Sequence, residues 1–304
     1  MRLLFTKLIK KFYYKQWLIG IYRGSITELI ETREFDPQIN WIAPKTLKKF
    51  YADPFLLPSK DQTIKILFEE FKLGEDYGNI SLLILDDNFK MIKTKLLLST
   101  KSHLSYPFIF QQEGKYYVFP EAAQSGSVSC YQYDCVNEEL VYQKDLLNFP
   151  LLDSTIIKHN NKYWLFGTTG ENTSRYDLYL FFSDTLLGSY IAHPQNPIKT
   201  GIDGIRSAGN FIETNGQIYR PAQNCKKKYG DSISINKIKK LNEEEFQEES
   251  VMNISLKRLN RKDRVDCIHT INSSNDLIVI DGQRWVFSPY LQLRKFFKDN
   301  FKQA

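Results

Sequence analysis

Residues 49–70 read K-F-Y-A-D-P-F-L-L-P-S-K-D-Q-T-I-K-I-L-F-E-E, and this stretch decides the fold. An aspartate opens a short apolar segment, a polar turn follows, and a second apolar segment ends in two glutamates. Short apolar or alternating runs separated by polar turn residues are typical of antiparallel β-strands. The stretch therefore predicts a β-hairpin that carries acidic side chains at one end.

The same hairpin pattern recurs along the chain. Residues 102–122 read S-H-L-S-Y-P-F-I-F-Q-Q-E-G-K-Y-Y-V-F-P-E-A, and residues 151–169 read L-L-D-S-T-I-I-K-H-N-N-K-Y-W-L-F-G-T-T. Two looser copies begin at Arg206 and Cys267. Further strand-like runs follow the hairpins, so each unit has four short strands and repeats about every 50 residues. Five such units predict an all-β fold, a five-bladed β-propeller.

One domain accounts for most of the chain, and we place it at residues 16–290. The 304 residues, 42% of them hydrophobic, can bury a full core, and no Pro- or Gly-rich linker divides them. Residues 16–23 precede the first repeat and have the composition of a strand, which predicts that they complete the last blade and close the ring. Residues 25–35 predict a helical or irregular connector. The acidic run after Asn242 predicts a capped surface helix.

The two ends of the chain are basic and amphipathic. Residues 1–15 and 291–304 predict short helices that either pack on the domain or rest on an anionic membrane surface. The first fifteen residues hold no uninterrupted apolar run, so we expect neither a signal peptide nor a membrane span there.

Charge and cysteine content restrict the class of protein. The net charge of +6 arises from basic residues scattered among acids, which argues against nucleic-acid binding. Four cysteines without a Cys-x-x-Cys pair favour reduced thiols. We therefore expect a cytoplasmic protein that is either free or peripheral at the inner face of the membrane.

Carboxylates gather where the repeats predict one end of the propeller axis. The inner strand of each blade runs beside the axis, so residues at its start point into a common funnel. Glycosyl chemistry needs two carboxyl groups, one protonated and one ionised, and like charges in an enclosed site separate their pKa values. The alternative is that the aspartates cap turns and the glutamates pair with lysines. Glu69 and Glu70 are neighbours on one strand and cannot both face the funnel. We take as catalytic candidates Asp53, Glu70, Glu121 and Asp153.

Polar and aromatic side chains near the same strand ends predict the substrate-binding residues. Arginine suits carboxylate or phosphate groups because its planar fork matches two oxygens. The alternative for the arginines is an internal ion pair, Arg206 with Asp153 or Arg220 with Glu121. The histidines are core residues, acid–base groups or ion ligands. The predicted substrate-binding set is His103, Tyr106, Arg206, Arg220, Gln223, Tyr229, His269 and Asp281.

The sequence assigns no cofactor and no metal ligand. A zinc site would need four convergent ligands, and the only candidates for it are Cys225, Cys267, His269 and His103. A central metal ion near His269 stays open as an alternative.

Taken in order, the motifs resemble a known family. The runs Y-A-D-P-F-L, H-L-S-Y-P-F with P-E-A, L-D-S-T-I, R-S-A-G-N-F with Y-R-P-A-Q-N, Y-G-D-S-I-S, I-H-T-I-N and I-D-G-Q-R are similar to the amino-terminal propeller of plant glucosamine inositolphosphorylceramide transferases. The resemblance covers about Trp41 to Arg284. Bacterial relatives that resemble it occur in surface-polysaccharide gene sets. In the plant proteins, transfer is assigned to a separate carboxyl-terminal glycosyltransferase domain, and we expect no such domain after Arg284.

More distantly, the pattern resembles five-bladed glycoside hydrolases such as arabinanases and invertases. That resemblance implies that Asp53 is a base or nucleophile and, more loosely, that Glu121 and Asp153 protonate the leaving group or modulate its donor. It also implies that His269 lies beside a central metal ion.

We therefore expect a carbohydrate-active protein of surface-polysaccharide or glycolipid biosynthesis, with glycosyltransferase or glycoside hydrolase chemistry in a central funnel. Its substrate would be a glycan, a nucleotide sugar or a lipid-linked sugar. The alternative is a non-catalytic module that binds the glycan or nucleotide sugar and presents it to a partner transferase. A third possibility is that the protein is a purely structural scaffold.

Overall fold

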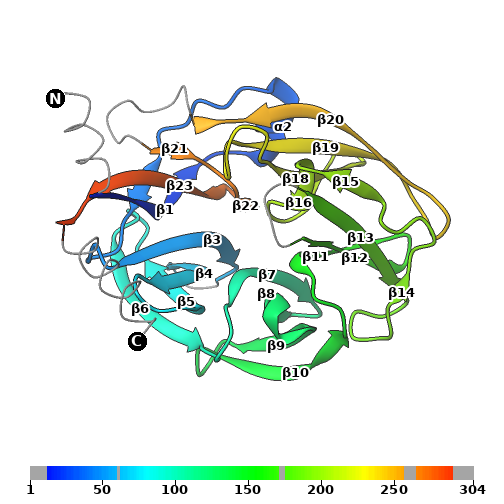
Figure 1. Ribbon diagram of the computed structural model, residues 1–304, viewed down its shortest axis with the longest axis horizontal. Coiled ribbons are helices and arrows are strands. Elements are labelled where there is room, and N and C mark those ends of the chain that lie inside the picture. Colours follow the sequence, from blue (N-terminus) through cyan, green and yellow to red (C-terminus); the bar gives the residue numbers. More distant parts are fainter. Residues whose placement is uncertain (1–11, 60–61, 171–174, 257–264, 290–304) are drawn as a thin grey trace, which may run out of the picture.

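A computed structural model of the chain describes residues 12–59, 62–170, 175–256 and 265–289, and the structural statements below concern these residues. Five antiparallel sheets form a ring, and the chain passes through them in order, from cyan through green and yellow to red (Figure 1). The prediction of an all-β, five-bladed propeller is confirmed.

The first two blades are sheets of four strands, each in simple meander order. Blade 1 contains β3 (Lys49–Leu57), β4 (Ile64–Lys72), β5 (Gly78–Leu85) and β6 (Met91–Leu98). Blade 2 contains β7 (Ser105–Gln112), β8 (Lys115–Glu121), β9 (Val128–Asp134) and β10 (Glu139–Leu147), with a short 3₁₀ turn at Ala123–Ser125.

Blades 3 and 4 each include one additional short strand. Blade 3 contains β11 (Leu152–His159), β12 (Lys162–Thr169), β13 (Tyr176–Ser183), β14 (Ile191–Ala192) and β15 (Lys199–Gly201). Blade 4 contains β16 (Asp203–Ser207), β17 (Ile212–Thr214), β18 (Gln217–Asn224), β19 (Ser232–Leu241) and β20 (Phe246–Ile254).

Blade 5 joins the two ends of the domain. Its strands are β21 (Val265–Cys267), β22 (Ile271–Ser274), β23 (Leu277–Phe287), β1 (Tyr13–Arg23) and β2 (Asn40–Ile42). All 11 residues of β1 pair with β23, in blue and red side by side in Figure 1. The predicted closure by the leading strand is confirmed, and the strand begins three residues earlier than we predicted.

Apolar residues of neighbouring blades interlock and fill the space between the sheets. Phe55, Phe108 and Leu165 are buried in one cluster that joins blades 1, 2 and 3. Ile19 and Ile66 are buried in another that joins blades 5 and 1. Because side chains alternate along a strand, this burial fixes the register of each sheet and thereby decides which residues face the axis.

The inner strands of blades 1, 2 and 3 start with the same irregularity. Asp53, Tyr106 and Asp153 have positive φ angles of 49°, 42° and 47°. At each of these positions the hairpin register shifts, as in a β-bulge. Bulges redirect side chains, and a positive φ at a residue other than glycine persists only where surrounding contacts hold it. The repeats therefore present three equivalent residues at the axis.

The Tyr106 hydroxyl ties several blades together on the axis. It lies 2.9 Å from Thr155 Oγ1 and accepts a hydrogen bond from the Gly209 backbone N–H at 2.8 Å. Gly209 has a φ of 132°, and a Cβ there would overlap the carbonyl oxygen of Ile271. The N–H of Ile271 in turn donates to the carbonyl oxygen of Ala208 at 2.8 Å. Blades 2 to 5 thus meet at one point that only glycine allows.

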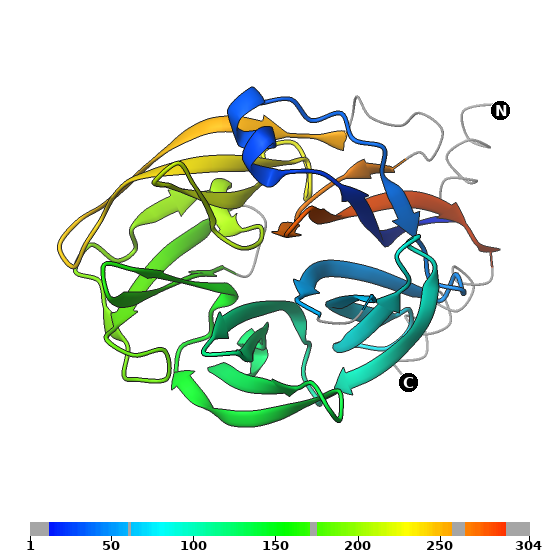
Figure 2. The same ribbon diagram turned by 180° about the vertical axis from the view of Figure 1, so that it is seen from behind.

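The connector after β1 is partly helical. Helix α2 (Ile26–Thr32) starts at Ser25, whose Oγ accepts the Glu28 N–H at 3.2 Å. Leu29 and Ile30 pack in a cluster with apolar residues of blade 4, and Figure 2 shows α2 beside the yellow and orange strands of that blade. The helical form of the predicted connector is the one observed.

The predicted helix after Asn242 is wrong. Asn242 Oδ1 accepts the backbone N–H groups of Glu244 and Glu245, at 2.9 and 2.8 Å, but this closes a turn rather than a helix. Leu241 pairs with Phe246, which is buried and begins β20. Asparagine caps turns as readily as helices, so the capping signal was ambiguous and burial of Phe246 decided the outcome.

The predicted terminal helices fall mainly on residues 1–11 and 290–304, which lie outside the described residues. Within the predicted segment 1–15, residues 13–15 belong to β1, because they pair with residues 285–287. This part of the prediction is corrected. Among the described residues, no helix has the length and apolar character needed to cross a bilayer.

Substituting alanine for Gly209 should destabilise the fold sharply. The added Cβ meets the backbone of the next blade and the φ angle is unfavourable. We expect a loss of about 3 kcal/mol or more in the free energy of unfolding. Thermal unfolding followed by circular dichroism measures it. Gly216→Ala is the matched control, because Gly216 also has positive φ but open space around it. The control should cost only about 1–2 kcal/mol, and equal losses in the two variants would contradict the axial contact.

Candidate active site

A cavity of about 740 Å³ lies at the end of the axis where the inner strands begin. Three carboxyl groups line it, those of Asp53, Glu69 and Glu121. Arg206 and Tyr229 line the same cavity from blade 4. The side chains therefore come from several blades, and the ring itself assembles the site.

Asp53 is buried and held from several sides. Its Oδ1 accepts the Thr270 hydroxyl at 2.7 Å, and its Oδ2 accepts the Tyr106 N–H at 3.2 Å. Its own N–H donates to Asp281 Oδ2 at 3.3 Å. Burial raises the pKa of Asp53 to about 6, although nearby His269 opposes that rise. The group is therefore ionised at neutral pH and close to its titration range.

His269 lies under the cavity between two carboxylates. Its Nδ1 forms an ion pair with Asp281 Oδ2 and lies 3.8 Å from Asp53 Oδ1. The Trp17 ring stacks on the imidazole at 4.1 Å with 10° between the planes, and Tyr229 meets it edge-on at 5.2 Å. Burial lowers the pKa of His269, but the two carboxylates outweigh burial and the net pKa is raised. The imidazole is thus stabilised in its protonated form.

Arg206 is shared between two acids. Its Nη2 donates to Glu121 Oε2 at 3.0 Å and to Asp153 Oδ1 at 3.1 Å, and its Nε donates to Asp153 Oδ2. Gln223 Nε2 donates to the same aspartate at 3.0 Å. Burial raises the pKa of Glu121 well above its usual value despite Arg206. The predicted ion pair of Arg206 with Asp153 is confirmed, so the positive charge of this arginine is already compensated.

Glu69 differs from the other lining acids in its partners. The Gly78 N–H donates to His103 Nδ1 at 2.9 Å, which leaves the hydrogen on Nε2, 3.7 Å from Glu69 Oε1. Burial and Arg206 lower the pKa of His103, so a neutral histidine faces the carboxyl group. Burial, with added repulsion from other acids, raises the pKa of Glu69 well above its usual value. Among the described lining acids, Glu121 pairs with an arginine, whereas Asp53 and Glu69 each lie beside a histidine.

The chemical capacity of the cavity follows from this contrast. Asp53 is ionised at neutral pH, whereas Glu69 keeps its proton to a higher pH than an ordinary glutamate. One group can accept a proton or attack an electrophilic carbon, and the other can donate a proton.

Five predicted residues line the cavity and five others lie beneath it. The lining residues are Asp53, His103, Glu121, Arg206 and Tyr229. The supporting residues, all at most 3% exposed, are Tyr106, Asp153, Gln223, His269 and Asp281. The second group reaches a ligand only through the first, so direct substrate contact, which we predicted for most of them, does not match their burial.

Glu70 and Arg220 are not part of the cavity, which corrects two predictions. Glu70 points to the opposite side of β4 from Glu69, and Lys49 Nζ lies 2.6 Å from its Oε1. Arg220 is 1% exposed and donates to Glu248 Oε1 at 2.6 Å. The predicted ion pair of Arg220 with Glu121 is therefore wrong as well. The Glu70 error arose because successive side chains alternate between the two faces of a strand. The Arg220 error arose because its partner, Glu248, lies on β20, a strand that we did not predict.

The sequence contained a signal for Glu69 that we did not use. Glu69 pairs with Ala52, the residue before the bulge in blade 1, and Glu121 pairs with Ser105, the residue before the bulge in blade 2. The two glutamates are therefore equivalent in the repeat. Thr169, at the end of the third repeated hairpin, also lines the cavity, as does Tyr176, which lies beyond that hairpin at the start of β13.

Asp53, His269 and Asp281 form the one group of at least three potential metal ligands that the described residues contain, with ligand atoms within 4.8 Å of one another. Their oxygens already accept hydrogen bonds. Asp281 Oδ1 accepts the N–H groups of His269 and Thr270, at 2.8 and 3.1 Å. A cation would have to displace the imidazole proton that pairs with Asp281. We therefore expect an ion pair rather than a metal ion at this group.

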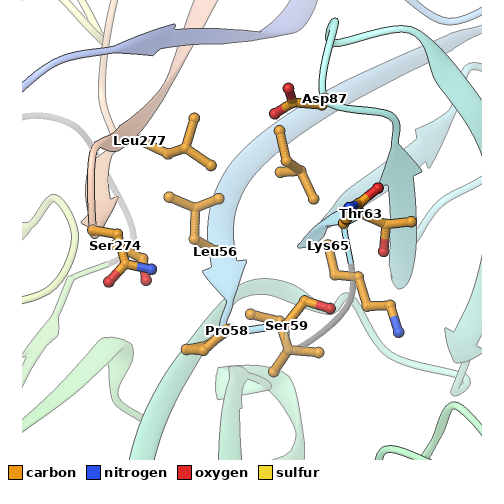
Figure 3. Close-up of a pocket in the computed structure, with 12 residues that line it drawn as sticks. Leu56, Pro58, Ser59, Thr63, Lys65, Asp87, Ser274 and Leu277 are labelled. Atoms are coloured by element: carbon orange, nitrogen blue, oxygen red, sulfur yellow. The ribbon is translucent and has the colours of Figure 1, made fainter.

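A second cavity, of about 430 Å³, lies at the turns between β3 and β4 and between β22 and β23 (Figure 3). Leu56 and Leu277 form part of its wall. Its described lining contains one acid, Asp87, and one base, Lys65, from different segments. It brings no set of reactive groups together, so the axial cavity is the candidate site.

The fold and the acidic axial cavity define a class, the five-bladed propellers with a carboxylate-lined pocket. Solved structures agree on the fold. A family 117 glycoside hydrolase of the marine bacterium Zobellia galactanivorans matches with a TM-score of 0.53 at 13% identity, over 90% of this chain and 91% of that one. A family 43 β-1,3-galactosidase matches with a TM-score of 0.54 at 12% identity, over 70% of this chain and 81% of that one.

The family is shown by sequence. Residues 43–283 match the family model described as glucosamine inositolphosphorylceramide transferase 1, N-terminal, and the chain belongs to this family. The rice protein of the japonica subspecies named glucosamine inositolphosphorylceramide transferase 1 is 32% identical over 255 residues, which is 76% of this chain and 34% of the rice protein. Its Arabidopsis thaliana namesake is 34% identical over 210 residues, 66% of this chain and 27% of that protein. The chain thus spans about a third of the length of these plant relatives.

Three histidines should titrate on opposite sides of the ordinary imidazole pKa of about 6.5. Two-dimensional NMR of the ring signals should give a midpoint above that value for His269 and midpoints below it for His103 and His193. Asp281→Asn should lower the His269 midpoint. Because the pKa of His269 is higher in the folded than in the unfolded protein, its protonation stabilises the fold. This stabilisation is complete below about pH 6.5, the unfolded pKa, and is lost as the pH rises through the folded pKa. A His269 midpoint below that of His103 would refute the ion pair.

Divalent cations should not stabilise the protein, because the oxygens around His269 are already engaged. We expect the same Tm with calcium chloride, with zinc chloride and with EDTA. A resident site at 100-fold saturation would add about 2.7 kcal/mol to the stability. A rise in Tm with either metal that Asp281→Asn abolishes would contradict this expectation.

Proposed function

We propose that the axial cavity binds a sugar and supports acid–base chemistry at a glycosidic carbon. The observation that carries the proposal is the pair of lining carboxyl groups with unlike partners. Asp53 lies 3.8 Å from His269, whose pKa is raised, and Glu69 lies 3.7 Å from His103, whose pKa is lowered by burial. Glycosyl chemistry needs such a pair, one group ionised and one protonated. The names of the relatives, a glycosyltransferase and glycoside hydrolases, support a carbohydrate substrate.

Asp53 would act as the base or nucleophile, because its pKa of about 6 lies below neutral pH and Thr270 and Tyr106 donate hydrogen bonds to its oxygens. Glu69 would donate the proton to the leaving oxygen. Glu121 and Arg206 would bind hydroxyl groups at the opposite wall, with Asp153 fixing the guanidinium. Tyr229 offers an apolar ring beside these groups.

The charge of the cavity favours an uncharged ring. Its one described arginine is bound by two carboxylates, and three carboxyl groups line the walls. A diphosphate would find no uncompensated cation among the described lining residues, whereas sugar hydroxyls can hydrogen-bond with all three carboxyl groups. Within the proposal, a glycan or a lipid-linked sugar therefore fits the cavity better than the phosphates of a nucleotide sugar. The names of the plant relatives favour a setting in glycolipid biosynthesis.

A binding module is the second candidate. The chain matches only about a third of the plant relatives, so the reaction named for those proteins can belong to the remaining part of them. In that case the cavity would hold the glycan for a partner transferase, and its acids would set affinity rather than rate.

Glu69→Gln should abolish most turnover, and Glu70→Gln should not. A panel of aryl glycosides of galactose, arabinose, xylose and glucosamine serves as probe. Losing a general acid costs about 10²–10⁴-fold in kcat for a poor leaving group, and less for dinitrophenyl glycosides, whose leaving group needs no proton. The pH profile should rise through about 6 as Asp53 ionises and fall where Glu69 loses its proton. Glu70 sits next in sequence but outside the cavity, so it is the matched control.

Two results would decide against catalysis. One is sugar binding by NMR saturation transfer without turnover of any aryl glycoside, together with a changed affinity in Asp53→Asn; this outcome selects the binding module. The other is equal activity of Glu69→Gln and Glu70→Gln on every substrate, which would remove the proposed proton donor.

A further inference from the structure

The paired strands β1 and β23 continue beyond the cavity. Asp281 pairs with Ile19 at the level of the site, and the ladder runs on to Tyr13 and Phe287. Its other end, at Arg23, lies beside the β22–β23 turn, at the far end of the propeller. The free end of the ladder is therefore on the cavity side, and it extends roughly 13 Å past Trp17 at about 3.3 Å per residue.

One face of this free end is aromatic and exposed. Tyr13, Trp285 and Phe287 are 38%, 52% and 49% exposed. Lys15 pairs with Trp285, and its Nζ lies 5.5 Å from the centre of that ring. The centres of the Tyr13 and Phe287 rings lie 5.2 Å apart. We name these four residues the aromatic tip.

The loop beside the aromatic tip has the same character. The Tyr14 hydroxyl donates to the carbonyl oxygen of Leu47, whose side chain is 44% exposed. Lys45 and Lys48 are exposed on either side of this leucine. Apolar side chains and lysines thus lie on both sides of β1 near its free end.

We propose that the aromatic tip docks on the surface of an anionic lipid bilayer. Tyrosine and tryptophan favour the boundary between headgroups and acyl chains, where one end of the ring is wet and the other dry. Lysines beside them match anionic headgroups. The first 16 residues of the chain contain five Lys or Arg and no Asp or Glu, so the charge next to β1 has the complementary sign.

Docking in this way turns the axial cavity toward the membrane. A sugar carried on a lipid could then enter the cavity without leaving the bilayer surface. The docking itself does not depend on the chemistry in the cavity, so the two proposals fail separately.

Vesicle co-sedimentation of the full chain tests the docking. Vesicles of phosphatidylcholine with 30% phosphatidylserine should bind the protein, and pure phosphatidylcholine should bind it much more weakly. Trp285→Ser with Phe287→Ser should weaken binding at least about tenfold, and Lys15→Glu about fivefold or more. Trp285 is the exposed one of the four tryptophans, so emission should shift to the blue on binding.

The matched control is Ile92→Ser with Leu96→Ser on β6. These residues are 57% and 56% exposed, so the control removes comparable apolar surface from the outer edge of blade 1. It should bind vesicles like the unaltered protein. Circular dichroism confirms that each variant is folded, and Lys15→Glu, an exposed charge change, remains informative if the double variant unfolds. Asp53→Asn should also bind vesicles normally.

Three outcomes would overturn the docking proposal. These are no sedimentation of the unaltered protein with anionic vesicles, an equal loss in the β6 control, and a concentration-dependent dimer that the tip variant abolishes. The last result would show that a second copy of the chain covers the tip.

Discussion

The pairing of β1 with β23 is the constraint on which the remaining structure depends. It joins segments more than 250 positions apart, closes the ring, and supplies the third strand of blade 5. The same pairing brings Trp17 onto His269 and opposes Ile19 to Asp281. Without it, blade 5 would lack its third strand and the imidazole under the cavity would lose the ring stacked against it. Fold and candidate site thus share one hydrogen-bonded ladder.

In and around the cavity, the described acidic side chains outnumber the basic ones, and this excess determines the pKa values of the acids. Burying an ion pair costs desolvation that the attraction offsets only when the groups are also hydrogen-bonded. Arg206 meets that condition with Asp153 and Glu121, and Arg220 meets it with Glu248, outside the cavity. Glu69 has only a neutral histidine. Burial of this carboxyl group therefore raises the pKa of Glu69. Binding a proton or a ligand hydroxyl reduces the free-energy cost of burying its charge.

The fold could be predicted from the sequence because each hairpin carries its own local signal. Apolar runs, turn residues and repeat length are all short-range, and the family match over residues 43–283 agrees with them. The acidic end of the axis was equally visible, since Asp53 and Glu121 sit at repeated positions. The sequence did not show whether each of these side chains lines the cavity or is buried beneath it. Whether a residue lines the cavity or lies under it depends on bulges and on packing between blades, which no single hairpin encodes.

Two errors show this limit in particular residues. Choosing Glu70 over Glu69 was an error of one position on an alternating strand, and the register of the equivalent Glu121 resolves it. Misplacing Arg220 had a different cause. Its partner Glu248 stands on β20, which the acidic composition of that run disguised as a helix. A wrong secondary structure therefore hid an ion pair on the neighbouring strand.

Closure of the ring by its first and last strands also sets an order of events during synthesis. Residues 13–23 are made more than 250 residues before their partner, residues 277–287. At about 5–20 residues per second the apolar strand β1 waits on the order of tens of seconds for its partner. During that interval it is an unpaired strand edge, the kind of segment that recruits other chains. Production of this protein should therefore be limited by the survival of an incomplete ring, and protection of β1 in the growing chain should raise the yield more than stabilising the finished fold.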